Sequence, residues 1–230
     1  MKIKSKTLHA RNTALFLSLI CGAAHAAQPG PASWADANKN MDYDTFMQAA
    51  KSSFPYATPD EYKSRVENDF TLKTCNATMD QPNAAQAAEI IKFEQARIQY
   101  PKEGKLAGDW QQGEKWAKGT TGGRIGFADA DNPNLPSGSN CFACHVMIPG
   151  FPGGNMGPSL IGYGKRGQSP AILKYTYDHV YDSKSLVPCT IMPRYGGQGH
   201  LLTAEQVADI VALLTDPQSP VNQPEKTAAQ

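Results

Sequence analysis

The chain has 230 residues, enough for one or two domains, and 40% of them are hydrophobic while 19% are charged. Together with many prolines and glycines, this composition is typical of a soluble globular protein with long loops and excludes a membrane-embedded or disordered chain. The formal net charge is only +1, and no run of basic residues points to nucleic acid as a partner.

The N-terminus has the pattern of a cleaved export signal. A basic start is followed by a short apolar core, residues 14–23, and by the small-x-small pattern Ala24-His25-Ala26. The apolar run is well short of the ~20 residues that cross a bilayer, so no membrane span is expected. A lipid-anchored start at Cys21 is disfavoured, because Ile20 is bulkier than the small residue expected before a lipidated cysteine. The sequence predicts cleavage near Ala26 and a periplasmic protein; loss of three lysines and one arginine leaves 18 basic against 21 acidic residues, a net charge of −3.

Residues 27–104 are interpreted as a helical N-terminal extension. Start and stop signals predict helices over residues 42–54, from Thr58 onward, and over residues 82–100. No catalytic constellation is visible in this region. We expect a helical layer that covers another part of the protein or holds a partner.

Residues 105–217 are predicted to form a second helical domain. A capped helix is expected near residues 110–117, and Gly113 within it indicates close approach by another helix, since an interior glycine costs about 1 kcal/mol against alanine. A capping box at Thr203 opens an amphipathic last helix. The tail, residues 218–230, is polar, and no β pattern is convincing, so the predicted fold class is mainly α.

The run Cys141-Phe142-Ala143-Cys144-His145 carries the chemistry of this domain. Cys-x-x-Cys-His is the attachment signature of a c-type haem: the two thiols reach two vinyl groups of one porphyrin, and the histidine supplies an iron ligand. Zinc would need a second Cys/His pair at short spacing, and a redox dithiol would need a strand before it, whereas residues 132–139 are a Pro-rich loop. We therefore expect one haem c, covalently bound through Cys141 and Cys144, with His145 on the iron.

The other face of the haem needs a second ligand or an open site. Met192 lies well downstream of His145, just before the last helix, and Pro193 stiffens its loop. Met147 is too close to His145 to pass round the ring edge, and Met156 lies in a Gly-Pro loop expected on the His145 side. Met192 is therefore the predicted sixth ligand. The alternatives are His179 and His200.

Two cysteines remain, Cys75 and Cys189. In an exported protein a structural disulfide between them is the plain interpretation, and it would tie the extension to the haem domain. The alternative is a reactive or interface thiol. Because Cys189 precedes Met192 by three residues, a thiolate ligand from it would strongly lower the haem potential.

From about residue 106 to residue 216, the chain resembles the small His/Met c-type cytochromes, in which the first helix crosses the last and a methionine strap closes the haem pocket. This resemblance implies that the Pro158 carbonyl accepts a hydrogen bond from His145. Leu160 is expected to pack on the ring. Candidates for contacts with the haem propionates are Tyr163, Lys165, Arg166 and Tyr195.

The segments Asn140–His145, Gly154–Leu160 and Met192–Gly196 are together similar to the SoxX family, monohaem subunits of the SoxAX cytochromes of bacterial sulfur oxidation. The resemblance covers about half of the chain. It implies a periplasmic heterodimer with a SoxA-like dihaem or monohaem cytochrome, which joins thiosulfate oxidatively to a cysteine of a SoxYZ-like carrier (an L-cysteine S-thiosulfotransferase type of reaction). The SoxX-like chain would then be a non-catalytic electron carrier that passes electrons to a soluble cytochrome. The alternatives are a stand-alone periplasmic carrier and a haem sensor or peroxidase.

Overall fold

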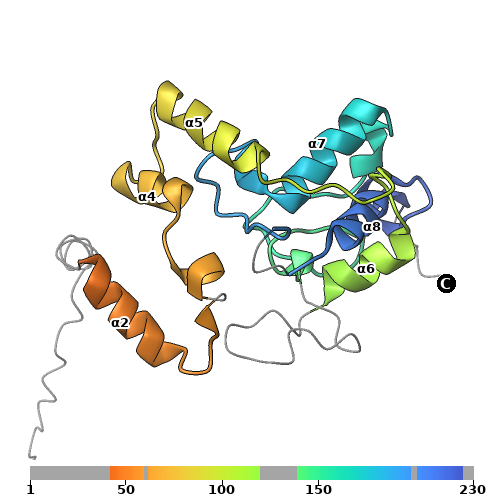
Figure 1. The fold of residues 1–230 in the computed structure, drawn as a ribbon. Coiled ribbons are helices and arrows are strands. Elements are labelled where there is room, and N and C mark those ends of the chain that lie inside the picture. The colour runs from red at the N-terminus through yellow and green to blue at the C-terminus, as the bar shows by residue number, and fades with distance from the viewer. Residues whose placement is uncertain (1–41, 60–61, 120–138, 198–200, 225–230) are drawn as a thin grey trace, which may run out of the picture. The chain divides into compact units, whose positions relative to one another are not determined.

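The computed structural model describes residues 42–59, 62–119, 139–197 and 201–224 (Figure 1). Over these ranges the chain is mainly helical, as predicted, and contains no strand. No helix in the described ranges is both long and apolar enough to cross a membrane. The predicted export signal with its cleavage site, and His200, lie outside the described residues.

The N-terminal extension is helical, but its elements differ in detail from those expected. The helix predicted from Thr58 is present as a π-helical turn. The third predicted helix begins close to its expected start, at a capping box between Asn83 and Gln86, but it ends at Gln95, well before the predicted end at residue 100. A further helix, capped by Asp69, was not predicted. The elements are α2 (Tyr43–Ser53), η1 (Tyr62–Val66), α4 (Phe70–Ala77) and α5 (Ala84–Gln95).

The second half of the chain contains the two predicted helices and one that was not predicted. Asp109 caps the first, and the capping box expected at Thr203 is formed with Gln206. The additional helix begins with Ser169 as cap and Pro170 at its first position. The elements are α6 (Trp110–Lys118), η3 (Cys141–Ala143), η4 (Tyr163–Arg166), α7 (Pro170–Tyr181), η5 (Ser183–Ser185), α8 (Ala204–Thr215) and η6 (Pro220–Asn222).

Helices α6 and α8 cross closely at Gly113, as the sequence indicated. A Cβ atom at Gly113 would lie 2.1 Å from the Asp209 carbonyl oxygen and 3.0 Å from Leu213 Cβ, so only glycine permits this crossing. The Asp209 carboxylate fixes the pair, accepting one hydrogen bond from Trp116 Nε1 at 3.1 Å and one from the Asp109 N–H at 2.8 Å. The first and last helices of the second domain are thereby held together.

Helix α8 is the centre of the core. Val207, Val211 and Leu213 are completely buried, and helix α7 packs against the same helix through residues that include Tyr177 and Val180. Each such apolar side chain contributes about 1.5–3 kcal/mol on burial. The core lies directly behind the pocket described below, because two further α8 residues form part of the pocket wall.

Helix α5 and the segment that follows it pack against the second half of the chain. Helix α5 contacts η5, and Gln95 Nε2 donates to the Ser185 carbonyl at 3.3 Å. The Tyr177 hydroxyl donates to the Gln99 carbonyl at 2.7 Å. These contacts bring the extension against the loop that carries Met192.

Candidate functional site

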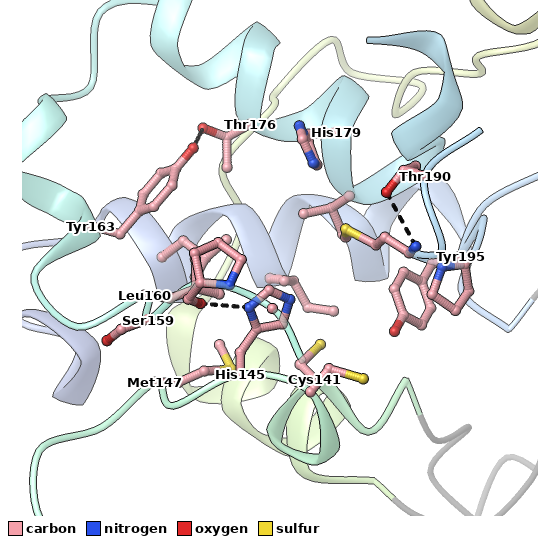
Figure 2. Close-up of a pocket in the computed structure, with 18 of the residues that line it drawn as sticks. Cys141, His145, Met147, Ser159, Leu160, Tyr163, Thr176, His179, Thr190 and Tyr195 are labelled. Atoms are coloured by element: carbon pink, nitrogen blue, oxygen red, sulfur yellow. Dashed lines mark hydrogen bonds between the residues drawn. The ribbon is translucent and has the colours of Figure 1, made fainter. Parts of the chain in front are cut away.

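A pocket with a volume of about 340 Å³ lies in front of α8 and α7 (Figure 2). This volume falls in the usual range for ligand pockets in proteins. Its apolar wall includes Leu160, Val180 and Ile210, and no carboxylate stands among the described residues that line it. The residues singled out for haem attachment and iron binding all line this pocket, although Met192 is distant from the other three in the sequence: Cys141, Cys144, His145 and Met192.

The Cys-x-x-Cys-His run forms a tight turn. Asn140 adopts a left-handed conformation with φ 43°, and the Cys141 carbonyl then accepts hydrogen bonds from the N–H groups of Cys144 (3.2 Å) and His145 (2.9 Å). Both thiols are free. Burial raises the pKa of Cys141, whereas a catalytic dithiol depends on a lowered one, so the environment does not favour a thiol–disulfide oxidoreductase.

The orientation of His145 is determined by its hydrogen bond to the protein. Its Nδ1 lies 2.7 Å from the Pro158 carbonyl oxygen (Figure 2). A carbonyl can only accept, so Nδ1 carries the proton and the lone pair of the neutral ring is on Nε2. Nε2 is therefore available to a metal, and the bond is the one that the cytochrome resemblance implied.

Gly157 leaves room for the His145 ring, a role that was not recognised when the sequence singled out the segment Gly154–Leu160. A Cβ atom at this position would lie 2.2 Å from Cε1 and 2.6 Å from Nδ1 of His145. The Gly157 N–H also donates to the Cys144 carbonyl at 2.8 Å. The loop thus packs its backbone directly against the imidazole, and any side chain at position 157 would push the ring out of place.

Met192 reaches the pocket from a loop rather than from a helix. Its N–H donates to Thr190 Oγ1 at 3.3 Å, and its carbonyl accepts from Ser183 Oγ at 2.7 Å and from Lys184 Nζ at 3.1 Å. Ser183 and Lys184 are both buried and were not recognised in the sequence. A pattern search would have missed them, because a serine and a lysine after a helix are ordinarily surface residues.

The other methionines and His179 have distinct positions. Met147 is buried in the core, and Met156 is exposed, with its sulfur 4.0 Å from Cys144 Sγ, which places it on the His145 side as expected. His179 lines the pocket from α7, and its Nδ1 is buried without a partner among the described residues (Figure 2). Burial, followed by the nearby His145 and Arg166, lowers the pKa of His179. Because its imidazole is uncharged and lies at the pocket wall, His179 remains an alternative to Met192 as the second ligand.

Three of the four candidate propionate contacts line the pocket. Tyr163 is engaged with Thr176 Oγ1 at 3.0 Å, and Arg166 stacks over the Tyr163 ring at 4.8 Å. Tyr195 is buried, and burial raises its pKa, so its hydroxyl remains protonated. Lys165 is exposed and does not line the pocket.

Cys75 and Cys189 are joined in a disulfide with a Cα–Cα distance of 5.4 Å, so Cys189 offers no thiolate to the pocket. Asp80 lies close to both sulfur atoms. This group is no metal site, because zinc and similar ions bind deprotonated thiols and both sulfurs are already bonded.

The donor set of the pocket fits a covalently bound haem. It combines two free thiols one turn apart, an imidazole with Nε2 available, a thioether and an apolar wall.

No family model matches the sequence. A protein of Aquifex aeolicus (strain VF5), named an uncharacterized lipoprotein, is 40% identical over 168 residues, which make up 70% of this chain and 75% of that protein. The chain belongs to the family of this lipoprotein. Membership in this family assigns no chemistry, so the function has to be inferred from the pocket.

Proposed function

We propose that this chain is an exported monohaem c-type cytochrome that transfers electrons as the SoxX-like subunit of a SoxAX-type complex. One observation carries the haem assignment: Cys141, Cys144, His145 and Met192 line a single pocket, and the His145 Nδ1–H is bonded to the Pro158 carbonyl. The two thiols would become thioethers to the porphyrin, and His145 Nε2 would bind the iron. A haem in this pocket supplies one-electron redox chemistry.

The residues of the chain would tune that chemistry in separate ways. The Pro158 carbonyl keeps the proton on His145 Nδ1 and strengthens Nε2 as a ligand. The Met192 thioether would hold the iron on the side opposite to His145, and a methionine ligand would raise the potential and would leave no open position for gases or peroxide, which favours electron transfer over sensing. Leu160 and Ile210 exclude water from the pocket wall.

The assignment to a SoxAX-type complex rests on the combined motifs at residues 140–145, 154–160 and 192–196. In this scheme a SoxA-like cytochrome carries out the thiosulfate chemistry on a SoxYZ-like carrier, and this chain passes the released electrons to a soluble cytochrome. It contributes no catalytic residue. Exposed apolar side chains at the pocket mouth, Ile191 and Met156, suit either a permanent or a passing partner. A stand-alone periplasmic carrier is therefore the second candidate.

Export is supported by the signal-like N-terminus and by the family relative, whose name describes a lipoprotein. That name favours, as a second form of the mature chain, lipid attachment at Cys21 instead of cleavage near Ala26. Intact-mass analysis of the native protein distinguishes the two starts, because diacylglycerol on Cys21 adds a large mass and makes the protein partition into detergent.

The first test of the function is isolation of the native protein under mild conditions, with the mass and covalent haem of every accompanying chain determined. A second c-type cytochrome in one-to-one ratio, together with reduction of the haem by thiosulfate and a SoxYZ-like carrier, is the expected result. A single monohaem chain in repeated low-salt preparations would favour the stand-alone carrier. A chain without covalent haem would overturn the proposal.

The second test concerns the sixth ligand. The ferric protein is expected to show the red-region methionine–iron charge-transfer band, and Met192→Ala is expected to abolish it. Met156→Ala is the matched control, since Met156 also lines the pocket but lies beside Cys144. A band that survives in Met192→Ala would point to another methionine, such as Met156, as the ligand. A band that is absent from the wild-type protein would point to a ligand other than methionine, such as His179.

A further inference from the structure

Met192 lies in a segment without regular structure, Cys189–Tyr195, which we call the methionine strap. The strap runs between η5 and the approach to α8. Its backbone-to-backbone hydrogen bonds to the preceding helix lie at its end, where the Tyr195 N–H donates to the Tyr181 carbonyl at 3.1 Å. A thioether is a weak iron ligand, and a loop held by few backbone bonds opens easily. Something else has to keep Met192 in position.

The beginning of the strap is held by the disulfide. Cys189 is bonded to Cys75, a buried residue of α4, and Met192 follows three positions later. Cys189 also has a left-handed backbone with φ 58°, a conformation that is unfavourable for residues other than glycine. The strap therefore leaves η5 by a turn whose first residue is covalently attached to the N-terminal extension.

The end of the strap is held by a group of charges. Arg194 pairs with Glu94, whose side chain is completely buried, and its Nη1 lies 3.0 Å from Asp69 Oδ2. Its Nε lies 3.6 Å from Asp182 Oδ2. Arg97 reinforces the group through Asp69 at 3.1 Å and Glu94 at 3.4 Å. Two of the three carboxylates around Arg194 thus belong to the N-terminal extension.

The middle of the strap is held from beneath by Lys184. Its buried ammonium donates to the Thr190 carbonyl at 2.9 Å and to the Met192 carbonyl at 3.1 Å. A buried ammonium is tolerated only where carboxylates compensate its charge. Burial and the charge of Arg194 lower the pKa of Lys184, whereas Asp182, Glu94 and Asp69 act in the opposite direction. Two carboxylates of the extension therefore favour the charged form of the lysine that contacts the Met192 backbone.

We propose that the segment Asp69–Arg97 of the N-terminal extension is a clamp that positions Met192 as the sixth ligand, by the Cys75–Cys189 disulfide on one side and the Glu94–Asp69–Arg194 ion pairs on the other. This inference rests on the proposed haem function. The residues of the clamp act through the strap and do not touch the haem pocket themselves.

The clamp has a measurable consequence. An external ligand such as imidazole can bind the ferric iron only when the strap has opened, so its apparent affinity is proportional to the open fraction. Loosening either attachment raises that fraction while leaving the rest of the fold in place. Imidazole affinity, followed by loss of the charge-transfer band, therefore reports on the strap and not on global stability.

The experiment compares the ferric holoprotein with two variants, Cys75→Ser/Cys189→Ser and Glu94→Gln. Each is expected to bind imidazole about tenfold or more tightly than the wild type. Asp109→Ala is the matched control, because it removes the cap of α6 and lowers stability without touching the strap. Its imidazole affinity is expected to stay within about twofold of the wild-type value.

A second route avoids dependence on variant folding. The disulfide of folded wild-type holoprotein is reduced, both thiols are alkylated, the iron is reoxidised, and intact mass confirms the product; imidazole affinity is then expected to rise as in the serine variant. If the wild type shows the band and neither the variants nor the alkylated protein bind imidazole more tightly, the clamp is wrong. If the wild type shows no methionine band at all, the proposed ligand set itself fails.

Discussion

The pocket has a histidine side, formed by residues 141–160, and a methionine side, formed by the strap, and the two are held by different kinds of interaction. On the histidine side, the turn bonds of Cys141 and the His145–Pro158 bond join residues that are close in the sequence. On the methionine side, the strap is held by a disulfide between cysteines separated by 114 residues. It is also held by ion pairs of Arg194 with Asp69 and Glu94, which are distant in the sequence. The histidine side is thus a local motif, and the methionine side depends on the whole fold.

The largest expected effect is a difference in covalent haem content between variants of the two cysteine pairs, of which one belongs to the histidine side and the other to the methionine side. Cys141→Ser/Cys144→Ser is expected to abolish covalent haem completely, because both thioether bonds are lost. Cys75→Ser/Cys189→Ser is expected to keep it, since that pair serves only the strap. Intact mass and haem staining after denaturation make the measurement. Covalent haem in the first variant, or its absence from the second, would contradict the assignment of separate roles to the two cysteine pairs.

The next effect tests how tightly the histidine side is packed. Gly157→Ala is expected to displace the His145 ring and to lower the free energy of unfolding of the holoprotein by about 1–3 kcal/mol, because its Cβ would overlap the imidazole. The neighbouring Ser159→Ala should change stability by no more than about 0.5 kcal/mol, since Ser159 is exposed. Denaturant unfolding and the haem spectrum measure both. An undisturbed spectrum in Gly157→Ala would mean that the loop can move away from the ring.

The locality of the histidine side explains why it could be predicted from the sequence. A short motif identifies Cys141, Cys144 and His145. In the same way, a single glycine inside a predicted helix, Gly113, indicates the close approach of another helix. The pairing of Cys75 with Cys189 could be expected because only these two cysteines remained after the signal and the haem motif.

The methionine side could be predicted only in part. Met192 was recognisable, but Ser183, Lys184 and Arg194 acquire their roles from partners that only folding brings near. Helix α4 was missed because its cap, Asp69, is followed by polar and apolar residues without clear helical periodicity. Helix α7 was not expected either, although Ser169-Pro170 is a start signal, and its position decides that His179 lines the pocket.

The clamp should also have a signature in the pH dependence of stability. Burial alone would raise the pKa of Asp69, but the Leu72 N–H and the charges of Arg194 and Arg97 outweigh it and hold this pKa below the ordinary value of 3.8. A carboxyl whose pKa is lowered by folding stabilises the protein above its unfolded pKa, and this contribution is lost as the pH falls through the folded pKa.

Asp69→Asn isolates this charge, because asparagine caps a helix as well as aspartate does. At about pH 6 the variant is expected to be less stable than the wild type by about 1–2 kcal/mol, and the difference should shrink toward zero as the pH falls through the lowered pKa of folded Asp69. Asp109→Asn is the control, since Asp109 caps α6 and forms no ion pair among the described residues. Equal pH profiles for both variants would show that the arginines do not stabilise Asp69.

The smallest expected effect concerns a single hydrogen bond to the strap, and η5 provides its own control. Ser183 and Ser185 are both completely buried, but Ser183 Oγ donates to the Met192 carbonyl at 2.7 Å, whereas Ser185 Oγ has no partner among the described residues. Ser183→Ala should therefore cost about 1 kcal/mol and raise imidazole affinity several-fold, while Ser185→Ala should be neutral or slightly stabilising, since it removes an unpaired polar group. If the two variants behave alike, the hydrogen bond from Ser183 to Met192 contributes nothing specific, and the strap is held by Lys184 and by its two ends.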